Sequence, residues 1–492
     1  MNQALKVGNK IKIYYLLSAL SLLLLQKIIF LFVAAPLPDE AYYWLWAKNI
    51  DLSYFDHPPL SIWFQSLLGI IITDKNLLIR AVPITCFILF MVIVYFWTKS
   101  VVTSFSLNIY LQSLVLALSL PILSIFLTIS FPDCVVILCL SLSGFFFSSF
   151  LRLSKNQVSR ITFWYLSVFF FSLAMLTKYN SVLFGLGILI FLIFYSKQKT
   201  IIFSRHLIIA IILIAIIQIP VIGWNITNEF LSFRFHLKDR LEFSIHLDQV
   251  LKQILVFFFG FIISFSPFFF LNTLSPRKTL SLNSLEDEQK KVASAIFIST
   301  LIFCCFLSIF ITVQYYWALP AIIAFIPILQ NILNTAGRFV GLFIFGIFLN
   351  TILIINYGVT PVSGLWGSVD RETGIVFGWK QITKEISTLK EKNNIRNVLF
   401  SDYRVGSLYA FHSGDTNIDV FMKDRDTQFD YWRKKRLDKA PSFNKALIVV
   451  DNQFPINSKI EKHFKDIQLI KNIEIKKGSV AIKSYKLYVA NN

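Results

Sequence analysis

The sequence is poor in charged residues and lacks a nucleotide-binding loop. Only 15% of its 492 residues are Asp, Glu, Lys or Arg, whereas 55% are hydrophobic, a balance that excludes a soluble protein of ordinary composition. No glycine-rich loop joins a strand to a helix, so a bound nucleotide is not indicated. The five cysteines lie in or at the ends of apolar runs without paired spacing, which argues against a zinc site and structural disulfides.

Apolar runs long enough to cross a bilayer recur from Ile13 to Ile355. A helix needs about 20 apolar residues to cross the hydrocarbon core, and one signal peptide would account for only one such run. The candidate spans lie near residues 13–35, 79–98, 108–127, 134–151, 161–177, 180–196, 207–223, 251–271, 293–312, 317–333 and 339–356. We therefore predict an all-α polytopic membrane protein with about 11 transmembrane helices.

The composition changes near Pro361, beyond which Lys, Asp, Asn and Glu become frequent. Short β-prone runs lie near 397–401, 417–421 and 446–450, and an amphipathic helix is expected near 379–392. The sequence thus predicts two domains. These are a transmembrane domain of residues 1–360 and a small soluble α/β domain of residues 361–492.

The net charge of +19 comes from basic residues in loops beside the apolar runs. There they set topology and meet anionic lipid, so membrane lipids are expected partners and nucleic acid is not. The basic loops alternate along the chain and contain Lys6, Lys10, Lys12, Arg152, Lys155, Arg160, Lys197, Lys199, Arg205, Arg277, Lys278, Lys290, Lys291 and Arg338. This pattern predicts a cytoplasmic N-terminus and, with an odd number of crossings, a C-terminal domain on the outer side.

The opposite set of loops carries a different group of ionisable residues. Asp39 and Glu40 follow the first apolar run, Asp133 lies in the second outer loop, and Lys178 and Tyr179 lie in the third. Charges this close to helix ends are costly unless they are solvated or paired, so their concentration on one face indicates a functional site. For each residue taken alone, solvation in a polar loop is the alternative explanation.

The first outer loop places acidic residues beside aromatic ones twice. Its two motifs are Pro38-Asp39-Glu40-Ala41-Tyr42-Tyr43-Trp44-Leu45-Trp46 and Tyr54-Phe55-Asp56-His57-Pro58-Pro59-Leu60. Because Tyr and Trp favour the membrane–water interface, we expect short juxtamembrane helices along the outer face. An aromatic belt would explain the Tyr and Trp residues but not the Asp-Glu pair.

These motifs resemble those of GT-C glycosyltransferases of the protein O-mannosyltransferase and lipid A aminoarabinose transferase type. The resemblance rests on Asp39-Glu40, Asp56-His57-Pro58-Pro59, Phe131-Pro132-Asp133, Leu176-Thr177-Lys178-Tyr179-Asn180, Tyr316-Trp317-Ala318-Leu319-Pro320, Gly378-Trp379 and Asp402-Tyr403. It implies a GT-C fold in a bacterial inner membrane, with the active site and the C-terminal domain in the periplasm. It also implies that a hexosyl or pentosyl group passes from a polyprenyl-phosphate donor to an envelope acceptor, which would be lipid A or lipopolysaccharide, another glycan or a protein.

The resemblance assigns the role of catalytic base to Asp39. The base would take the acceptor's proton as the acceptor attacks the anomeric carbon with inversion. Glu40 and Asp133 would then orient the acceptor, position Asp39 or bind a cation. No cofactor is required by this chemistry. A divalent cation stays open because hard cations prefer oxygen ligands, but the sequence does not define its ligands.

Two positions depart from the aminoarabinose transferases, which carry Asp-Glu-Gly-Arg and Glu-Lys-Pro-Pro in the first loop. Tyr42 stands where Arg would, and His57 stands where Lys would, so two phosphate-binding cations are missing or weakened. Lys178 is then the expected contact of the donor phosphate, with His57 as a second donor. The side chains expected to line the site for the sugar or the first isoprenes are Tyr179, Tyr316 and Trp317, with an interfacial belt as the alternative. Tyr42 is also expected among the residues that bind the substrate.

Two other functions fit a polytopic basic protein. A transporter or flippase of lipid-linked sugars should place its ionisable groups near the bilayer midplane, whereas here nearly all of them are predicted at one outer face. An O-antigen ligase or polymerase would centre its chemistry on one large outer loop, and it ranks below the transporter.

Overall fold

The computed structural model describes residues 12–153, 159–239, 247–273, 284–333, 335–367, 369–436, 443–477 and 480–492. Its chain divides into two compact units. The first unit comprises the chain up to Ile28, His57–Ser61 and Arg80–Thr351, and the second comprises Ile29–Asp56, Ile62–Ile79 and Ile352–Asn492. The boundary predicted between residues 360 and 361 stays a prediction. Five of the basic residues used for topology lie outside the described residues, namely Lys6, Lys10, Lys155, Arg277 and Lys278.

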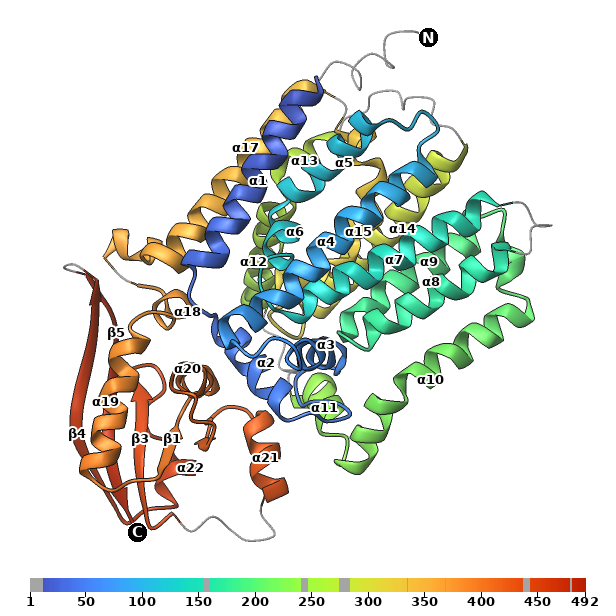
Figure 1. Cartoon of the computed structure of the whole chain (residues 1–492). Coiled ribbons are helices and arrows are strands. Elements are labelled where there is room, and N and C mark those ends of the chain that lie inside the picture. Colours follow the sequence, from blue (N-terminus) through green and yellow to red (C-terminus); the bar gives the residue numbers. More distant parts are fainter. Residues whose placement is uncertain are drawn as a thin grey trace. The chain divides into compact units, whose positions relative to one another are not determined.

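The described part of the first unit consists of helices and the loops that join them (Figure 1). The longer ones are α1 (Ile13–Val33), α4 (Lys75–Val101), α5 (Leu107–Ser119), α7 (Pro132–Arg152), α8 (Ser159–Met175), α9 (Val182–Phe194), α10 (Arg205–Thr227), α12 (Leu247–Phe265), α14 (Ser284–Leu307) and α17 (Ala336–Ile354). Shorter helices are α6 (Pro121–Phe126), η2 (Tyr179–Ser181), η3 (Lys199–Ile201), α11 (Leu231–Arg234), η4 (Phe235–Asp239), α13 (Pro267–Thr273), η5 (Tyr315–Ala318), α15 (Pro320–Ile323), η6 (Ile326–Ile328) and α16 (Leu329–Ile332). Four of the described helices contribute residues to both units, namely α1, α3 (Leu60–Leu68), α4 and α17.

Seven of the described helices are long and apolar enough to cross a membrane, namely α1, α4, α7, α10, α12, α14 and α17. The pair Tyr315–Ile323 and Ile326–Ile332, bent by 60°, is an eighth candidate. The chain is therefore a multi-pass membrane protein. Every predicted span coincides with a helix or a broken helix, but Leu107–Ser119, Ser159–Met175 and Tyr179–Phe194 are shorter apolar helices. The count of eleven stays a prediction.

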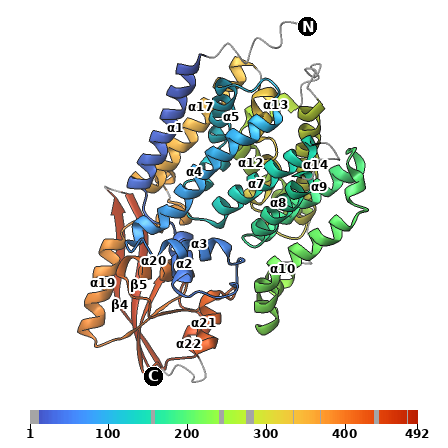
Figure 2. The same cartoon turned by 45° about the vertical axis from the view of Figure 1, so that its right-hand side comes forward.

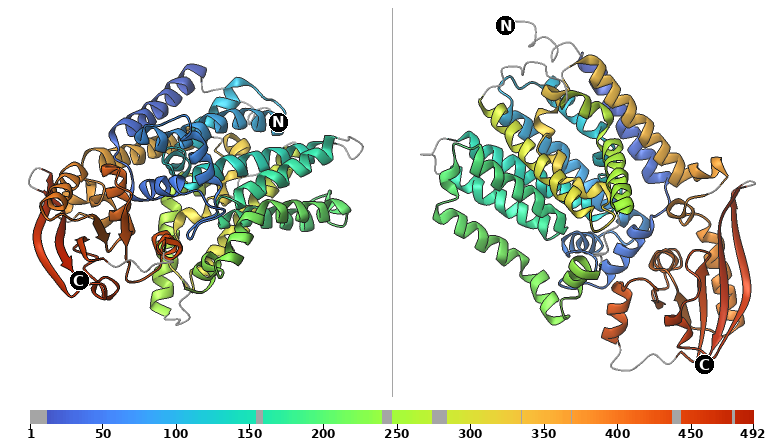
Figure 3. Two further views of the ribbon diagram at one scale, coloured as in Figure 1. Left: turned by 60° about the horizontal axis from the view of Figure 1, so that its bottom comes forward. Right: turned by 180° about the vertical axis from the view of Figure 1, so that it is seen from behind.

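Small residues and buried polar groups join the helices of the first unit. A Cβ atom on Gly187 of α9 would lie 2.3 Å from the Cα of Ile296 on α14, so these two helices require a residue without a side chain at their crossing. Gln26 of α1 donates to the carbonyl of Ile347 on α17 at 2.9 Å. Figure 2 shows α7, α8 and α9 side by side, and the right panel of Figure 3 shows the same for α1 and α17. These contacts are typical of packing within a bilayer.

The second unit contains a five-stranded sheet of order β2-β1-β3-β5-β4. Its strands are β1 (Asn397–Phe400), β2 (Ile418–Val420), β3 (Lys445–Asp451), β4 (Asp466–Lys477) and β5 (Val480–Asn491). Strand β1 is parallel to β2 and β3, whereas β5 is antiparallel to β3 and β4. The three predicted strands and the predicted α/β character are confirmed. The hairpin of β4 and β5 escaped prediction because β4 has little burial to produce an alternating pattern.

The remaining helices of the second unit include those that cover the sheet and those that follow the first apolar run. They are α2 (Pro38–Lys48), α3 (Leu60–Leu68), η7 (Ile355–Val359), η8 (Val362–Trp366), α18 (Arg371–Gly374), α19 (Trp379–Lys392), α20 (Tyr403–Ser413), α21 (Gln428–Arg436) and α22 (Ser458–Glu461). The predicted amphipathic helix is confirmed as α19, which buries Ile382, Ile386 and Leu389. Ring contacts of Trp379 with Tyr485 and of Phe400 with Tyr409 place α19 and α20 on one face of the sheet. The short helix α2 after the first span is of the kind predicted for the first loop.

Candidate functional site

Two candidate carboxylates occupy the same position in a helix. Helices α2 and α7 begin with proline, and Asp39 and Asp133 are the second residue of each. The preceding residues, Leu37 and Phe131, are extended, with φ −75° and ψ 155° and with φ −98° and ψ 156°, as expected before proline. Proline suits the first helical position because it loses no hydrogen bond there. The local sequence thus brings both carboxylates to a helix N-terminus, which attracts negative charge.

Glu40 serves the start of the same helix. Its side chain is buried, and Oε2 accepts a hydrogen bond from the backbone N–H of Leu37 at 3.0 Å. This is the reciprocal half of a capping box, which satisfies a backbone donor that the helix leaves unpaired. Sequence analysis treated the two acids as one feature, but their contacts differ. Glu40 caps α2, whereas Asp39 does not take part in the cap.

Asp39 is held by a tyrosine from the C-terminal part of the chain. The hydroxyl of Tyr403, the first residue of α20, donates to Oδ1 of Asp39 at 3.1 Å. Burial, and then the negative charge of Asp39, raise the pKa of Tyr403 well above its usual value. Tyr403 therefore keeps its proton and acts as a hydrogen-bond donor to the carboxylate.

Tyr42, on the same helix as Asp39, links a second acid to the C-terminal part of the chain. Its hydroxyl donates to Oδ2 of Asp56 at 3.2 Å and accepts from the backbone N–H of Gln428 at 2.8 Å. Burial, and then the charge of Asp56, raise the pKa of Tyr42 well above its usual value. Arg425 completes the group, because its Nη2 lies 3.1 Å from Oδ1 of Asp56 and its guanidinium lies 5.0 Å from the ring centroid of Tyr403.

In the first unit, two other predicted residues form a buried ion pair. Lys178 Nζ donates to both carboxylate oxygens of Asp133, at 2.8 and 2.7 Å, and the two side chains are 8% and 1% exposed. The ammonium also lies 4.7 Å from the ring centroid of Tyr316. The predicted phosphate-binding lysine is therefore charge-neutralised by the predicted acid and lies beside a predicted aromatic residue.

The other predicted residues of the first unit are Tyr179, Trp317 and His57. The hydroxyl of Tyr179 shares a hydrogen bond with that of Ser232 at 3.1 Å. The backbone carbonyl of Trp317 accepts from the side-chain amide of Asn180 at 3.0 Å. His57 is half-buried. The roles of these residues stay predictions.

The structure thus sorts the predicted residues into two groups, one in each unit. Asp39, Glu40 and Tyr42 belong to the second unit, whereas the first contains His57, Asp133, Lys178, Tyr179, Tyr316 and Trp317. Within the described ranges, no three His, Cys, Asp or Glu side chains come together in a way that could hold a metal ion. The side chains of these two groups can transfer protons, form hydrogen bonds and pair charges.

Sequence analysis missed Arg425 and Gln428 and gave no role to Asp56 or Tyr403. Tyr403 lies in the Asp402-Tyr403 motif, which was one of the signals of the resemblance. Arg425 and Gln428 lie in a polar segment with no periodicity, so no local pattern distinguishes them from solvated loop residues. Their part in the site is seen only in the structure, where Arg425 contacts Asp56 and Gln428 contacts Tyr42.

Comparisons with known proteins agree with this architecture. Residues 56–224 match the family model described as dolichyl-phosphate-mannose-protein mannosyltransferase, a segment that includes Asp133 and Lys178 and begins after Asp39. No curated protein matches the chain.

Two solved structures of ArnT from Cupriavidus metallidurans share the fold. The structure bound to undecaprenyl phosphate is 12% identical, with a TM-score of 0.61 over 96% of this chain and 98% of that chain. The apo structure is 11% identical, with a TM-score of 0.62 over 96% of this chain and 97% of that chain. The chain therefore has the GT-C fold, and its resemblance to the membrane glycosyltransferases of that fold is confirmed.

Proposed function

We propose that this protein transfers a sugar from a polyprenyl-phosphate donor to an envelope acceptor, with Asp39 as the base. The observation that carries the proposal is the geometry of Asp39. It is half-buried at the N-terminus of α2, and one of its carboxylate oxygens is fixed by the hydroxyl of Tyr403 at 3.1 Å. A carboxylate held in this way is suited to accept a proton in a defined direction. The undecaprenyl phosphate bound to ArnT supports a lipid-linked donor.

The proposed reaction is a single displacement at the anomeric carbon. The acceptor's hydroxyl or amine gives its proton to Asp39 and forms a bond to the anomeric carbon. The bond from that carbon to the phosphate oxygen breaks, and its electron pair leaves with the polyprenyl phosphate. Attack from the face opposite the phosphate inverts the configuration. Positive or hydrogen-bonding groups must stabilise the charge on the departing phosphate.

Lys178 is the proposed phosphate contact, and its ion pair bears on how it would act. Asp133 neutralises its charge. A donor phosphate at this position would therefore compete with Asp133 for the same ammonium, and the aromatic ring of Tyr316 would remain beside it. Asp133 would thus keep the lysine paired between turnovers. His57 is proposed as a second contact of the phosphate. Tyr179 and Trp317 are proposed to line the site for the sugar or the first isoprenes.

The placement in the cell is part of the same proposal. Residues 1–360 would form the catalytic transmembrane domain and residues 361–492 a periplasmic domain, in the inner membrane of a bacterium with a cytoplasmic N-terminus. The alternation of basic loops supports this orientation. The sugar would be a hexose or a pentose, and the acceptor lipid A or lipopolysaccharide, another glycan or a protein.

The test measures transfer of labelled sugar from polyprenyl-phosphate donors to envelope acceptors in vesicles. Asp39→Asn should lower the rate of transfer by at least about 100-fold, the contribution of a general base, while donor binding is retained. Asp51→Asn is the matched control, because Asp51 lies in the same loop but contacts Tyr431 and Lys435. Undiminished transfer by Asp39→Asn would remove Asp39 from the mechanism. Movement of donor between leaflets without transfer would favour the flippase.

A further inference from the structure

We infer that the C-terminal part of the chain supplies positioning residues to the catalytic site, with Tyr403 orienting Asp39 and a loop centred on Arg425 holding Asp56. This inference rests on the proposed function, because it concerns the same base. It assigns to the C-terminal residues a part in catalysis itself, beyond the folding of a separate domain.

Contacts other than the hydrogen bond to Asp39 hold the backbone and the ring of Tyr403 in place. It opens α20 directly after Asp402, whose side chain caps the helix by accepting from the backbone N–H of Arg404 at 3.0 Å. The Arg404 guanidinium binds the same carboxylate, with Nη2 2.7 Å from Oδ2. On the other side, the ring of Tyr403 packs against that of Tyr42, with centroids 4.7 Å apart. The hydroxyl of Tyr403 therefore has little freedom of its own, and its hydrogen bond restricts the rotation of the Asp39 carboxylate.

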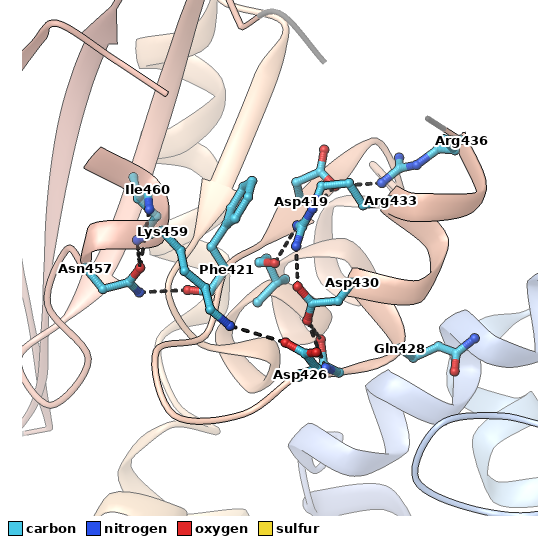
Figure 4. Close-up of polar contacts among 12 residues, drawn as sticks. Asp419, Phe421, Asp426, Gln428, Asp430, Arg433, Arg436, Asn457, Lys459 and Ile460 are labelled. Atoms are coloured by element: carbon cyan, nitrogen blue, oxygen red, sulfur yellow. Dashed lines mark hydrogen bonds and ion pairs between the residues drawn. The ribbon is translucent and has the colours of Figure 1, made fainter. Parts of the chain in front are cut away.

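The loop from Phe421 to Thr427, which we call the 421–427 loop, connects β2 to α21 and is fixed at both ends (Figure 4). At its start, the side-chain amide of Asn457 donates to the carbonyl of Phe421 at 2.8 Å. At its end, the backbone N–H and the hydroxyl of Thr427 donate to Oδ2 of Asp430, at 2.8 and 3.0 Å. Lys459 pairs with Asp426 at 3.3 Å. These contacts give the loop a defined shape.

The 421–427 loop and Gln428, the first residue of α21, contact the first outer loop. Arg425 pairs with Asp56, and the backbone N–H of Gln428 donates to the hydroxyl of Tyr42. The side-chain carbonyl of Gln428 accepts from the backbone N–H of Phe55 at 2.8 Å. Gln428 thus uses both its backbone and its side chain to hold the first loop. Since Tyr42 and Asp39 share α2, the same contacts hold the helix that carries the base.

The charges in this group favour positioning over the binding of a further anion. Arg425 pairs with the carboxylate of Asp56, so its single positive charge is already balanced. A phosphate placed beside it would be repelled by that carboxylate. Arg425 therefore positions Asp56 in preference to binding a further anion.

The decisive variant is Tyr403→Phe, which removes one hydroxyl and keeps the ring. Asp39 retains its charge and its place on α2 but loses the bond that orients it. We expect kcat for transfer to fall about 10- to 100-fold, since misorientation of a catalytic group costs this much. The KM for the donor should stay within about twofold, because the lost contact serves the transition state and not donor binding.

Tyr431→Phe is the matched control. Tyr431 also lies in the C-terminal part of the chain, and its hydroxyl donates to Oδ2 of Asp51 at 2.9 Å, in the same outer loop. This variant loses a bond of the same kind between the same two segments, and its kcat should stay within about twofold of the wild type. Equal thermal stability of the two variants in detergent would show that differences in transfer do not come from folding.

A double-mutant cycle separates orientation of Asp39 from other effects. In the Asp39→Glu background the carboxylate is already displaced, so adding Tyr403→Phe should cause no further loss of transfer. The inference is overturned if Tyr403→Phe transfers as fast as Tyr431→Phe, or if its loss is undiminished in the Asp39→Glu background. If Asp39→Asn itself retains transfer, the proposed function fails and the inference fails with it. If Asp39→Asn loses transfer and Tyr403→Phe does not, the inference is overturned while the proposed function stands.

Discussion

Replacing Lys178 with methionine leaves the carboxylate of Asp133 buried without its cation. Two charge-assisted hydrogen bonds, at 2.8 and 2.7 Å, are lost together. The carboxylate is only 1% exposed, so water cannot replace them without a change in structure. Removing one partner of a buried ion pair costs about 3–5 kcal/mol, because the other charge stays buried and uncompensated. Methionine fills most of the lysine's volume, so we expect the free energy of unfolding to fall by about that amount.

The measurement is unfolding by sodium dodecyl sulfate in mixed micelles, followed by circular dichroism. Lys291→Met is the control, because Lys291 pairs with Asp287 on the surface, where both side chains are 47% exposed. Its loss should cost less than about 1 kcal/mol, as hydration replaces a solvent-exposed pair. A second variant combines Asp133→Asn with Lys178→Met. It should recover most of the lost stability, because no buried charge remains.

Two results would refute this reasoning. One is a Lys178→Met protein as stable as Lys291→Met, which would mean that the pair is hydrated or that the segment rearranges at little cost. The other is a double variant less stable than Lys178→Met alone. That outcome would show that the site requires a charged Asp133 for reasons other than its pairing with Lys178.

Two further predictions concern stability alone. Gly346→Ala should destabilise the protein by about 1–3 kcal/mol, since the new Cβ would lie 2.3 Å from the carbonyl oxygen of Ser119; Gly337→Ala on the same helix meets nothing within 4 Å and should leave the thermal midpoint unchanged or raised. Burial lowers the pKa of His412 to about 4, below its unfolded value of about 6.5. The unfolded state therefore binds the proton first, and His412 lowers stability by up to about 3 kcal/mol as the pH falls from about 6.5 to 4. His412→Phe, which preserves stacking on Trp379, should remove this part of the pH dependence, and parallel curves for the two proteins would contradict it.

The membrane region was predictable because its requirement is local. A bilayer demands apolar length, and each predicted span coincides with a helix or a broken helix. The number of crossings was less accessible, because α5, α8 and α9 are apolar but short, and hydropathy does not show whether a short helix crosses alone or with its neighbour. The starts of α2 and α7 at Pro38 and Pro132 came from the structure, because sequence analysis placed Asp39 and Asp133 in loops.

In the C-terminal part of the chain, the sequence pattern predicted some strands and not others. Strands β1, β2 and β3 are buried and rich in branched residues, so they were found. Strand β4 is long but mostly exposed and pairs on one side alone with β5. Its residues therefore alternate weakly, and the pairing that stabilises it is a property of the sheet.

By itself the sequence determined that the protein lies in a membrane and that one set of its loops concentrates acids and aromatics. These follow from composition and from interactions between near neighbours. Only the tertiary structure decided which groups meet: Tyr403 bonds Asp39 across 364 positions, and Lys178 pairs with Asp133 across 45. Such pairings depend on how α2 packs against α20 and on ångström distances between side chains. No periodicity along the chain predicts these pairings. The partner of the predicted base could therefore be identified only from the fold.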